Sequence, residues 1–394
     1  MLQNCQTFYF LDNEYYFYRD QPYGYYDDGE RIAFFAKAIV DAIPHIPDFP
    51  CNILHCNDWH TALSPIYLRE LYQDNPALSC IKTIFTIHNL KFQGQMSSSV
   101  LGDVLGLDQI PNAVYQLCLD ADSINYMKGA LCYSDILTTV SPTYALEIQH
   151  PYFGEHLDYI FRDRCSILHG IINGIDTTSY NCTSDPLICA NYDINHIKGK
   201  RVCKVALQKE LGLIEDTKIP IIAMIGRLTS QKGLDLVDRM MDEILSHDLQ
   251  MVILGTGDPK FENMFRYYEA KYPDKLRALI KFDEALSHRI YSGADLLLMP
   301  SQFEPCGLSQ MIAMAYGTLP IVRETGGLKD TVTPYNQYTG KGTGFSFANY
   351  NAHEMYHTIM LAIDLFNNNQ KQWRSLMKQA MKLDFSWNTP AKEY

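Results

Sequence analysis

The chain has 394 residues and a formal net charge of −12, from 33 Lys and Arg against 45 Asp and Glu. Its hydrophobic fraction of 47% and charged fraction of 20% are those of a folded globular protein, and its length predicts two domains. The negative field excludes nucleic acid and anionic lipid surfaces as general partners. A phosphate-bearing ligand must therefore be held locally, by a few basic residues and backbone N–H groups.

The cysteine pattern and the first residues of the sequence indicate the cellular location. Eleven Cys are spread along the chain without a CxxC pair, which favours a reducing, cytoplasmic location. The first residues do not resemble a basic segment followed by an apolar signal core. No apolar run reaches the ~18 to 20 residues of a membrane helix, so the sequence predicts no integral membrane protein.

Short apolar runs typical of β-strands alternate with helix-length segments. Runs of four to six apolar residues bounded by Gly, Pro or Asn are typical of buried parallel strands in βα units. The chain is therefore predicted to be an α/β protein. The predicted strands are Ile53–His55, Thr83–His88, Ile136–Val140, Ile221–Ile225, Met251–Leu254, Leu296–Met299 and Leu319–Val322.

A domain junction is predicted near Asn173. The stretch 180–190 (YNCTSDPLICA) is polar and rich in turn residues, and it precedes an amphipathic helix predicted over 198–211 with Gly212 as its C-cap. Two α/β lobes joined here would leave a crevice at the carboxyl ends of both sheets, the usual ligand site of such folds.

Polar side chains follow two strands of the first lobe, in HCNDWH (55–60) and TIHN (86–89). A metal site is disfavoured, because alternate residues at a strand end point in opposite directions and no pair has a zinc spacing. A sugar suits the cluster better. Trp59 offers an apolar face, while Asp58 and His88 can exchange hydrogen bonds with hydroxyls.

The segment GRLTSQKG (226–233) follows the strand Ile221–Ile225. Arg227 supplies a planar fork for two oxygens and Lys232 a compact charge, a pair well suited to a diphosphate. The alternative is an exposed basic loop without a ligand. The strand before the loop and the helix predicted after it favour binding.

Two further loops follow strands of the same lobe. In PSQFEPCGLSQ (300–310), Glu304 stands at a strand end and Cys306-Gly307-Leu308 opens a helix whose free N–H groups can face a sugar or phosphate; the alternative is a solvated cap. In ETGGLKD (324–330), adjacent glycines allow backbone amides to approach an anion, although a bare TGG marks only a turn. All three loops are expected to emerge on one rim.

These segments together resemble glycosyltransferase family 5, the bacterial glycogen synthases and plant starch synthases. The resemblance runs from about Tyr9 to Tyr394. It rests on HCNDWHTAL, TIHNLKFQGQ, INYMKGALCYSD, VSPTYALEI, GIINGID, GRLTSQKGLDLV, ILGTGDPKFE, SHRIYSGADLLLMPSQFEPCGLSQMIAMAYGTLPIVRETGGLKDTV and DFSWNTPAKEY, in this order and spacing.

The resemblance implies a GT-B fold of two Rossmann-like domains facing a cleft. The implied domains are residues 1–172, a nucleotide-sugar domain over 173–378, and a last helix over 379–394 that returns to the first domain. The family transfers glucose from ADP-glucose to the non-reducing end of an α-1,4-glucan in glycogen or starch biosynthesis. It retains the anomeric configuration and uses no metal or other cofactor.

Site roles are carried over by motif. The resemblance assigns Arg227 and Lys232 to the diphosphate and Glu304 to the essential acid near the donor glucose. It assigns His88 and Asp58 to glucose and acceptor contacts, and the apolar face of Trp59 places this residue with the acceptor. The remaining expected nucleotide-sugar contacts are Gly226, Asn173, Phe282, Cys306, Gly307, Leu308, Thr325, Gly326 and Gly327.

Two departures from the family pattern stand out. Phe282 stands where a Tyr stacking on adenine is expected, so a ring face is kept and a hydroxyl is lost. Family members begin with a strand and a Lys-Thr-Gly-Gly-Leu loop, which this sequence does not show. The first domain is therefore expected to be truncated, and an alternative is a fragment that binds nucleotide or glucan and needs a separate N-terminal segment. A glucan phosphorylase would need a pyridoxal-phosphate lysine and a longer chain.

Overall fold

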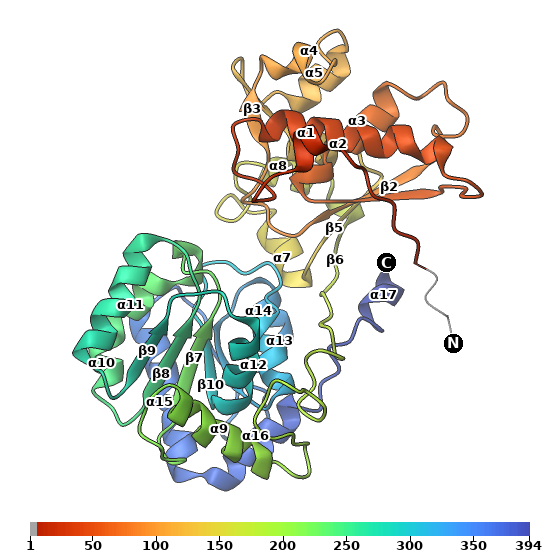
Figure 1. Cartoon of the computed structure of the whole chain (residues 1–394). Coiled ribbons are helices and arrows are strands. Elements are labelled where there is room, and N and C mark those ends of the chain that lie inside the picture. Colours follow the sequence, from red (N-terminus) through yellow and green to blue (C-terminus); the bar gives the residue numbers. More distant parts are fainter. Residues whose placement is uncertain (1–5) are drawn as a thin grey trace. The chain divides into compact units, whose positions relative to one another are not determined.

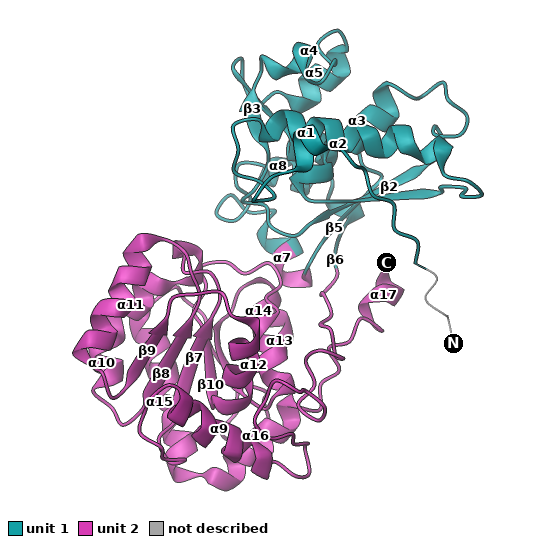
Figure 2. Ribbon diagram, viewed as in Figure 1, with its two compact units in different colours: residues 1–140, 145–170 teal, residues 141–144, 171–394 magenta. Residues whose placement is uncertain are grey.

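The computed structural model of the protein describes residues 6–394 and divides the chain into two compact units (Figure 2). Unit 1 is Met1–Val140 with Ala145–Gly170, and unit 2 is Ser141–Tyr144 with Ile171–Tyr394. The predicted return of residues 379–394 to the first domain stays a prediction. Within the described residues, no helix is long and apolar enough to cross a membrane.

Unit 1 is built on a parallel four-stranded sheet in the order β1-β2-β5-β6, of which Figure 1 labels β2, β5 and β6. Its strands are β1 (Ile53–Asn57), β2 (Lys82–Ile87), β5 (Ile136–Thr139) and β6 (Leu168–Gly170). Phe85 and Leu137 face each other in register on β2 and β5 and are fully buried. Parallel strands need such burial because helices cover their faces.

The helices of unit 1 pack around large buried aromatic side chains. Helix α3 contacts both α2 and α6, and Tyr67 of α3 and Tyr126 of α6 lie in this core. A small antiparallel pair, β3 (Gln95–Ser97) and β4 (Ser123–Asn125), stands apart from the main sheet. The helices are α1 (Glu14–Phe17), α2 (Asp28–Ala42), α3 (Leu63–Glu70), α4 (Val100–Asp103), α5 (Pro111–Leu117), α6 (Tyr126–Tyr133), α7 (Pro142–Glu147, which crosses the unit boundary) and α8 (Asp158–Asp163).

Unit 2 contains a six-stranded parallel sheet in the order β12-β11-β10-β7-β8-β9. The four central strands are almost entirely buried, as expected for apolar strands covered on both faces. The strands are β7 (Ile221–Ile225), β8 (Gln250–Leu254), β9 (Leu276–Leu279), β10 (Leu296–Met299), β11 (Leu319–Arg323) and β12 (Phe345–Phe347).

Helices cover the sheet of unit 2 (Figure 1). Helix α10 shows why: Leu234, Val237, Met241 and Ile244 recur at helical spacing and are buried. The helices are α9 (Lys198–Glu210), α10 (Leu234–Leu245), α11 (Pro259–Lys271), α12 (Glu284–Gly293), α13 (Ser309–Ala315), α14 (Gly326–Thr331), α15 (Ala352–Asn368), α16 (Gln370–Ala380) and α17 (Pro390–Glu393).

All seven predicted strands are present, so the α/β prediction is confirmed. Helix α9 matches the prediction over 198–211, and Gly212 follows it with a φ of +63°, as a helix C-terminus requires. Strands β6, β9 and β12 and the β3–β4 pair were not predicted. They are strands of three or four residues, and β9 carries Arg277, so none stands out as an apolar run.

Candidate active site

The three predicted loops leave one edge of the unit 2 sheet. Strands β11, β10 and β7 are neighbours and run parallel, so their carboxyl ends meet at the same edge. The loops that follow them carry residues 226–233, 300–308 and 324–325. The expectation of a common rim is confirmed, and this edge is where ligands bind in open parallel sheets.

Close backbone packing shapes the loop after β7. Gly233 has a φ of +69°, and a Cβ built on it would lie 2.0 Å from the carbonyl oxygen of Pro300. A side chain is therefore excluded, and the loops after β7 and β10 are held together. A single 3-10 turn, Ser230–Lys232, presents Lys232 on the rim, while Arg227 is exposed just beyond the end of β7.

Lys232 and Glu304 form an ion pair at the centre of the rim. The Lys232 Nζ lies 2.7 Å from the Glu304 Oε2, and the Ser301 Oγ donates a second hydrogen bond to this oxygen at 2.9 Å. The side chain of Glu304 is 9% exposed and that of Lys232 is 24% exposed. The carboxylate is thus fixed by two donors from different loops, and the ammonium group keeps part of its surface open to a ligand.

The adjacent glycines of the third loop pack on the chain that carries Glu304. A Cβ on Gly326 would lie 2.1 Å from the Glu304 carbonyl oxygen, and the Gly327 N–H donates to the carbonyl oxygens of Glu304 and Pro305, both at 3.1 Å. Thr325, which precedes them, is buried. The glycines therefore satisfy a packing requirement, and their predicted contact with phosphate stays a prediction.

Asn173 lies beside the loop after β10. Its main chain is hydrogen-bonded to the Cys306 thiol, and burial raises the pKa of that thiol to about 12. The thiol is therefore neutral near pH 7, and the predicted contact of Cys306 with the nucleotide sugar stays a prediction. The side-chain Oδ1 of Asn173 is buried and has no hydrogen-bond partner among residues 6–394. A buried acceptor without a donor is rare, and a ligand hydroxyl would satisfy it.

The remaining predicted contacts of unit 2 also border this edge. Phe282 follows β9 and is 88% exposed, so its ring is free to stack on a ligand. Gly307 has a φ of +70°, and the exposed Leu308 directly precedes α13. Gly226 directly follows β7 and has a φ of +149°. Their roles in nucleotide-sugar binding stay predictions.

Asp58 and His88 follow adjacent strands of unit 1. The Asp58 Oδ1 accepts the backbone N–H of His88 at 2.8 Å, so this carboxylate ties the end of β1 to the end of β2. Burial raises the pKa of Asp58, and the His88 hydrogen bond opposes this shift. The His88 Nε2 is hydrogen-bonded to the Asn57 Oδ1 at 2.9 Å. Asp58 therefore stabilises the ends of β1 and β2, and its predicted contact with substrate stays a prediction.

One side of the Trp59 indole packs against the backbone at Gly94. A Cβ on Gly94 would lie 2.6 Å from the Trp59 indole, so only glycine fits there. The His60 ring lies 4.4 Å away, centroid to centroid. Trp59 stays partly exposed, and its predicted contact with an acceptor sugar stays a prediction. Within residues 6–394, no group of three or more His, Cys, Asp and Glu could hold a metal ion.

Ser301 is a site residue that was not predicted. It stands one residue after Pro300 in the quoted PSQFEP segment, and its side chain is fully buried against Glu304. A small hydroxyl residue three positions before a strand-end carboxylate was the available signal. The Lys232–Glu304 pair was not predicted either, because 72 residues separate the partners.

Comparison with family models identifies the class of protein to which both units belong. Residues 2–163 match the starch synthase catalytic domain, and residues 209–380 match the glycosyl transferases of group 1. The fold and the rim therefore define a glycosyltransferase with two Rossmann-like units, the GT-B architecture. A sucrose-phosphate synthase from Thermosynechococcus elongatus shares this fold at 20% identity and a TM-score of 0.58, over 93% of this chain and 76% of that protein.

Closer relatives define the family. The chain is 51% identical to glycogen synthases of Bacillus anthracis and Lachnospira eligens, aligned over 100% and 99% of its own length and 82% of theirs. It superposes on the catalytic domain of starch synthase IV from Arabidopsis thaliana, bound to ADP and acarbose, with a TM-score of 0.89 and 36% identity. That match covers 96% of this chain and 78% of the plant protein. The chain belongs to the glycogen synthase and starch synthase family.

Proposed function

We propose that the chain transfers glucose from ADP-glucose to the non-reducing end of an α-1,4-glucan, with retention of configuration and without a metal. The observation that carries this proposal is the Lys232–Glu304–Ser301 cluster on the rim of unit 2. A fixed carboxylate beside a partly open ammonium group suits a site in which a sugar is bonded to a phosphate. The relative bound to ADP and acarbose supports a nucleotide and a sugar-type ligand.

The basic residues of the rim serve the leaving group in this proposal. Negative charge develops on ADP as the glycosidic bond to it breaks, and preorganised positive charge lowers the free energy of that transition state. Arg227 has no ion pair among residues 6–394, so its guanidinium is free for the diphosphate. Lys232 reaches the same oxygens while keeping its contact with Glu304.

The carboxylate of Glu304 serves the sugar. It is held by two donors and is largely buried, so it cannot turn away into solvent. Its negative charge lies where a glucosyl group bearing partial positive charge would form. The unsatisfied Oδ1 of Asn173 offers an acceptor for a hydroxyl of the same sugar. In unit 1, the proposal assigns Asp58, His88 and Trp59 to glucose and acceptor contacts.

Glu304→Gln tests the proposal, because it keeps the shape of the side chain and removes its charge. We expect transfer of labelled glucose into glycogen to fall by at least roughly 100-fold, as when an electrostatic group of an active site is removed. ADP affinity, measured by calorimetry, should change little. Glu210→Gln is the matched control, since Glu210 lies at the end of α9, away from the rim, and is ion-paired with Arg289 of α12.

The assignment of Glu304 requires that Glu304→Gln lowers glucose transfer while ADP affinity is kept. If the Glu304→Gln variant keeps most of its turnover, Glu304 has no essential role in the reaction. The same assay addresses the alternative of a binding fragment. ADP binding by the natural sequence without any turnover would favour that alternative, whereas turnover would exclude it. Alignment of essentially the whole chain to enzymes favours the catalytic function.

A further inference from the structure

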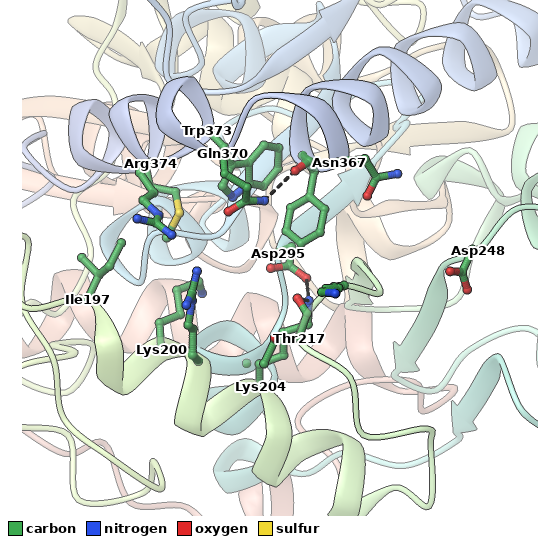
Figure 3. Close-up of a pocket in the computed structure, with 15 residues that line it drawn as sticks. Ile197, Lys200, Lys204, Thr217, Asp248, Asp295, Asn367, Gln370, Trp373 and Arg374 are labelled. Carbon is green, nitrogen blue, oxygen red and sulfur yellow. Dashed lines mark hydrogen bonds and ion pairs between the residues drawn. The ribbon is translucent and has the colours of Figure 1, made fainter.

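A cavity of unit 2 lies away from the rim. It has a volume of about 600 Å³, a size typical of small-molecule sites. Helices α9 and α16 provide opposite walls, with Lys200 and Lys204 on one side and Trp373 and Arg374 on the other (Figure 3). The segment 217–218, which precedes β7, and Asp295, which precedes β10, also line the cavity.

The cavity stands at the opposite edge of the sheet from the rim. The lining residues next to the sheet precede its strands: Thr217 and Lys218 precede β7 and Asp295 precedes β10. The loops that carry Arg227 and Glu304 follow the same two strands. Because parallel strands share one direction, the amino and carboxyl ends of the sheet are separate edges. A ligand in this cavity would therefore not occupy the proposed donor site.

The lining is cationic in a chain that is acidic overall. Five basic residues border the cavity, against the acidic Asp248 and Asp295, while the whole chain has a net charge of −12. The basic residues are Lys200, Arg201, Lys204, Lys218 and Arg374. Like charges placed around one cavity repel one another, and this repulsion is relieved when an anion binds between them.

Two of the five basic residues already have structural partners. The buried Lys200 ammonium donates to the carbonyl oxygens of Tyr291 and Ser292 and to the Thr318 hydroxyl, between 2.7 and 3.3 Å. These carbonyls belong to the last turn of α12, which a cation stabilises. Lys204 lies 2.7 Å from Asp295, whose carboxylate also accepts the Ile221 N–H at the start of β7.

The other three basic residues carry unbalanced charge. Arg201, Lys218 and Arg374 are exposed, and none of them forms an ion pair within the part of the chain that the structure describes. They come from α9, from the segment before β7 and from α16. Three cations from three separate elements meet at one cavity, and packing of the fold does not require them there.

The rest of the lining indicates the ligand class. Phe366, Trp373 and Met377 give an apolar side, while Thr217, Asn367 and Gln370 offer polar groups for hydroxyls. The aromatic rings are almost fully buried, so a neutral glucan has no open ring face on which to stack. Guanidinium groups instead bind phosphate oxygens in pairs. The lining thus suits a phosphate attached to a polar carbon skeleton.

We propose that this cavity is an accessory site for a small phosphorylated sugar. Arg201, Lys218 and Arg374 hold the phosphate, and the polar side chains hold the hydroxyls. Binding joins α9 to α16, so it stabilises the folded form of unit 2 against unfolding. The proposal does not depend on the function proposed for the rim.

The test measures fructose 1,6-bisphosphate binding to the full chain by calorimetry, without ADP, because ADP also carries phosphates and would compete for a basic cavity. The double variant R201A/R374A should weaken the affinity roughly tenfold or more, since two charge-assisted contacts are lost. The matched control K198A/K371A removes two exposed charges from the same helices, outside the cavity. It should leave the affinity within about twofold.

Thermal unfolding distinguishes a variant that has lost contacts with the ligand from a variant that has not folded. The two double variants should have the same thermal midpoint without ligand, which shows that both are folded. Absence of fructose 1,6-bisphosphate binding at millimolar concentration, or equal losses in both variants, would overturn the proposal. Inorganic phosphate that binds as tightly as the sugar phosphate would overturn the assignment of a sugar. Glucose alone should not bind.

Discussion

Replacing Lys232 with Ala should have two separable consequences, because this side chain is expected to bind a ligand and also balances Glu304. Its Nζ lies 2.7 Å from a carboxylate that is 9% exposed. Arg227→Ala removes a basic group of the same rim that has no ion pair among residues 6–394. Both variants should lose ADP affinity, but only Lys232→Ala should also lose stability.

The magnitudes follow from the contacts. Each basic residue that contacts a phosphate through a charge-assisted hydrogen bond contributes roughly 1.5 to 3 kcal/mol, which corresponds to roughly a 10- to 150-fold loss of ADP affinity. Removing Lys232 also leaves the Glu304 carboxylate with the Ser301 hydroxyl as its remaining side-chain donor. Because Lys232 is partly exposed, we expect a free energy of unfolding lower by about 1 to 3 kcal/mol.

Calorimetry with ADP and thermal unfolding without ligand measure the two effects. A domain of this size loses roughly 2 to 4 °C of Tm per kcal/mol, so Lys232→Ala should melt several degrees lower while Arg227→Ala melts like the natural sequence. In the double variant K232A/E304Q the stability loss should shrink, since no uncompensated charge remains. Unchanged ADP affinity in both single variants would refute the diphosphate assignment. Equal Tm values for the two would refute the argument from the ion pair.

Three further outcomes are expected. Gly233→Ala should destabilise unit 2 by more than about 1 kcal/mol in urea unfolding, because its φ is +69° and its Cβ would lie 2.0 Å from the Pro300 carbonyl oxygen; a neutral result would show that the two loops can separate. Burial lowers the pKa of Lys200 to about 8, so between pH 8 and 10.5 the unfolded chain binds more protons there and stability rises with pH. The difference in unfolding free energy between the natural chain and Lys200→Met should therefore grow in favour of the natural chain, by on the order of 1 kcal/mol per pH unit in that window, and a constant difference would contradict it. Glucosyl transfer should persist in EDTA, since Arg227 and Lys232 supply the positive charge; loss that Mg²⁺ restores would disprove a metal-free reaction.

The strands that carry the site could be predicted from the sequence. Ile221–Ile225 and Leu296–Met299 are predicted to the residue, because an uninterrupted apolar run that ends at a glycine or proline is typical of a short buried strand. The common rim followed from strand order in a parallel sheet. By contrast, β12 consists of three residues, and its place at the sheet edge depends on pairing with β11, which a local pattern cannot show.

The inner contacts of the site could not be predicted. The glycines at 326 and 327 were expected to approach an anion, whereas the structure shows them against the backbone of Glu304 and Cys306. A sequence reveals that a glycine is present but not which neighbour requires it. The buried, unsatisfied Oδ1 of Asn173 is likewise not visible in a local sequence pattern. Such facts need the tertiary structure.

The glycine contacts of the rim have a consequence for how this enzyme can diverge. A Cβ at Gly233 or Gly326 would lie 2.1 Å or less from a carbonyl oxygen of a neighbouring loop, and the same holds for Gly255, which directly follows β8 and packs on Gly226. Single substitutions of these glycines are therefore excluded unless the backbone of the rim moves. Phe282, in contrast, is exposed and borders the same edge. Variation in the preferred nucleobase should therefore accumulate at Phe282 and similar exposed side chains, while the glycine framework stays fixed across homologues with different donors.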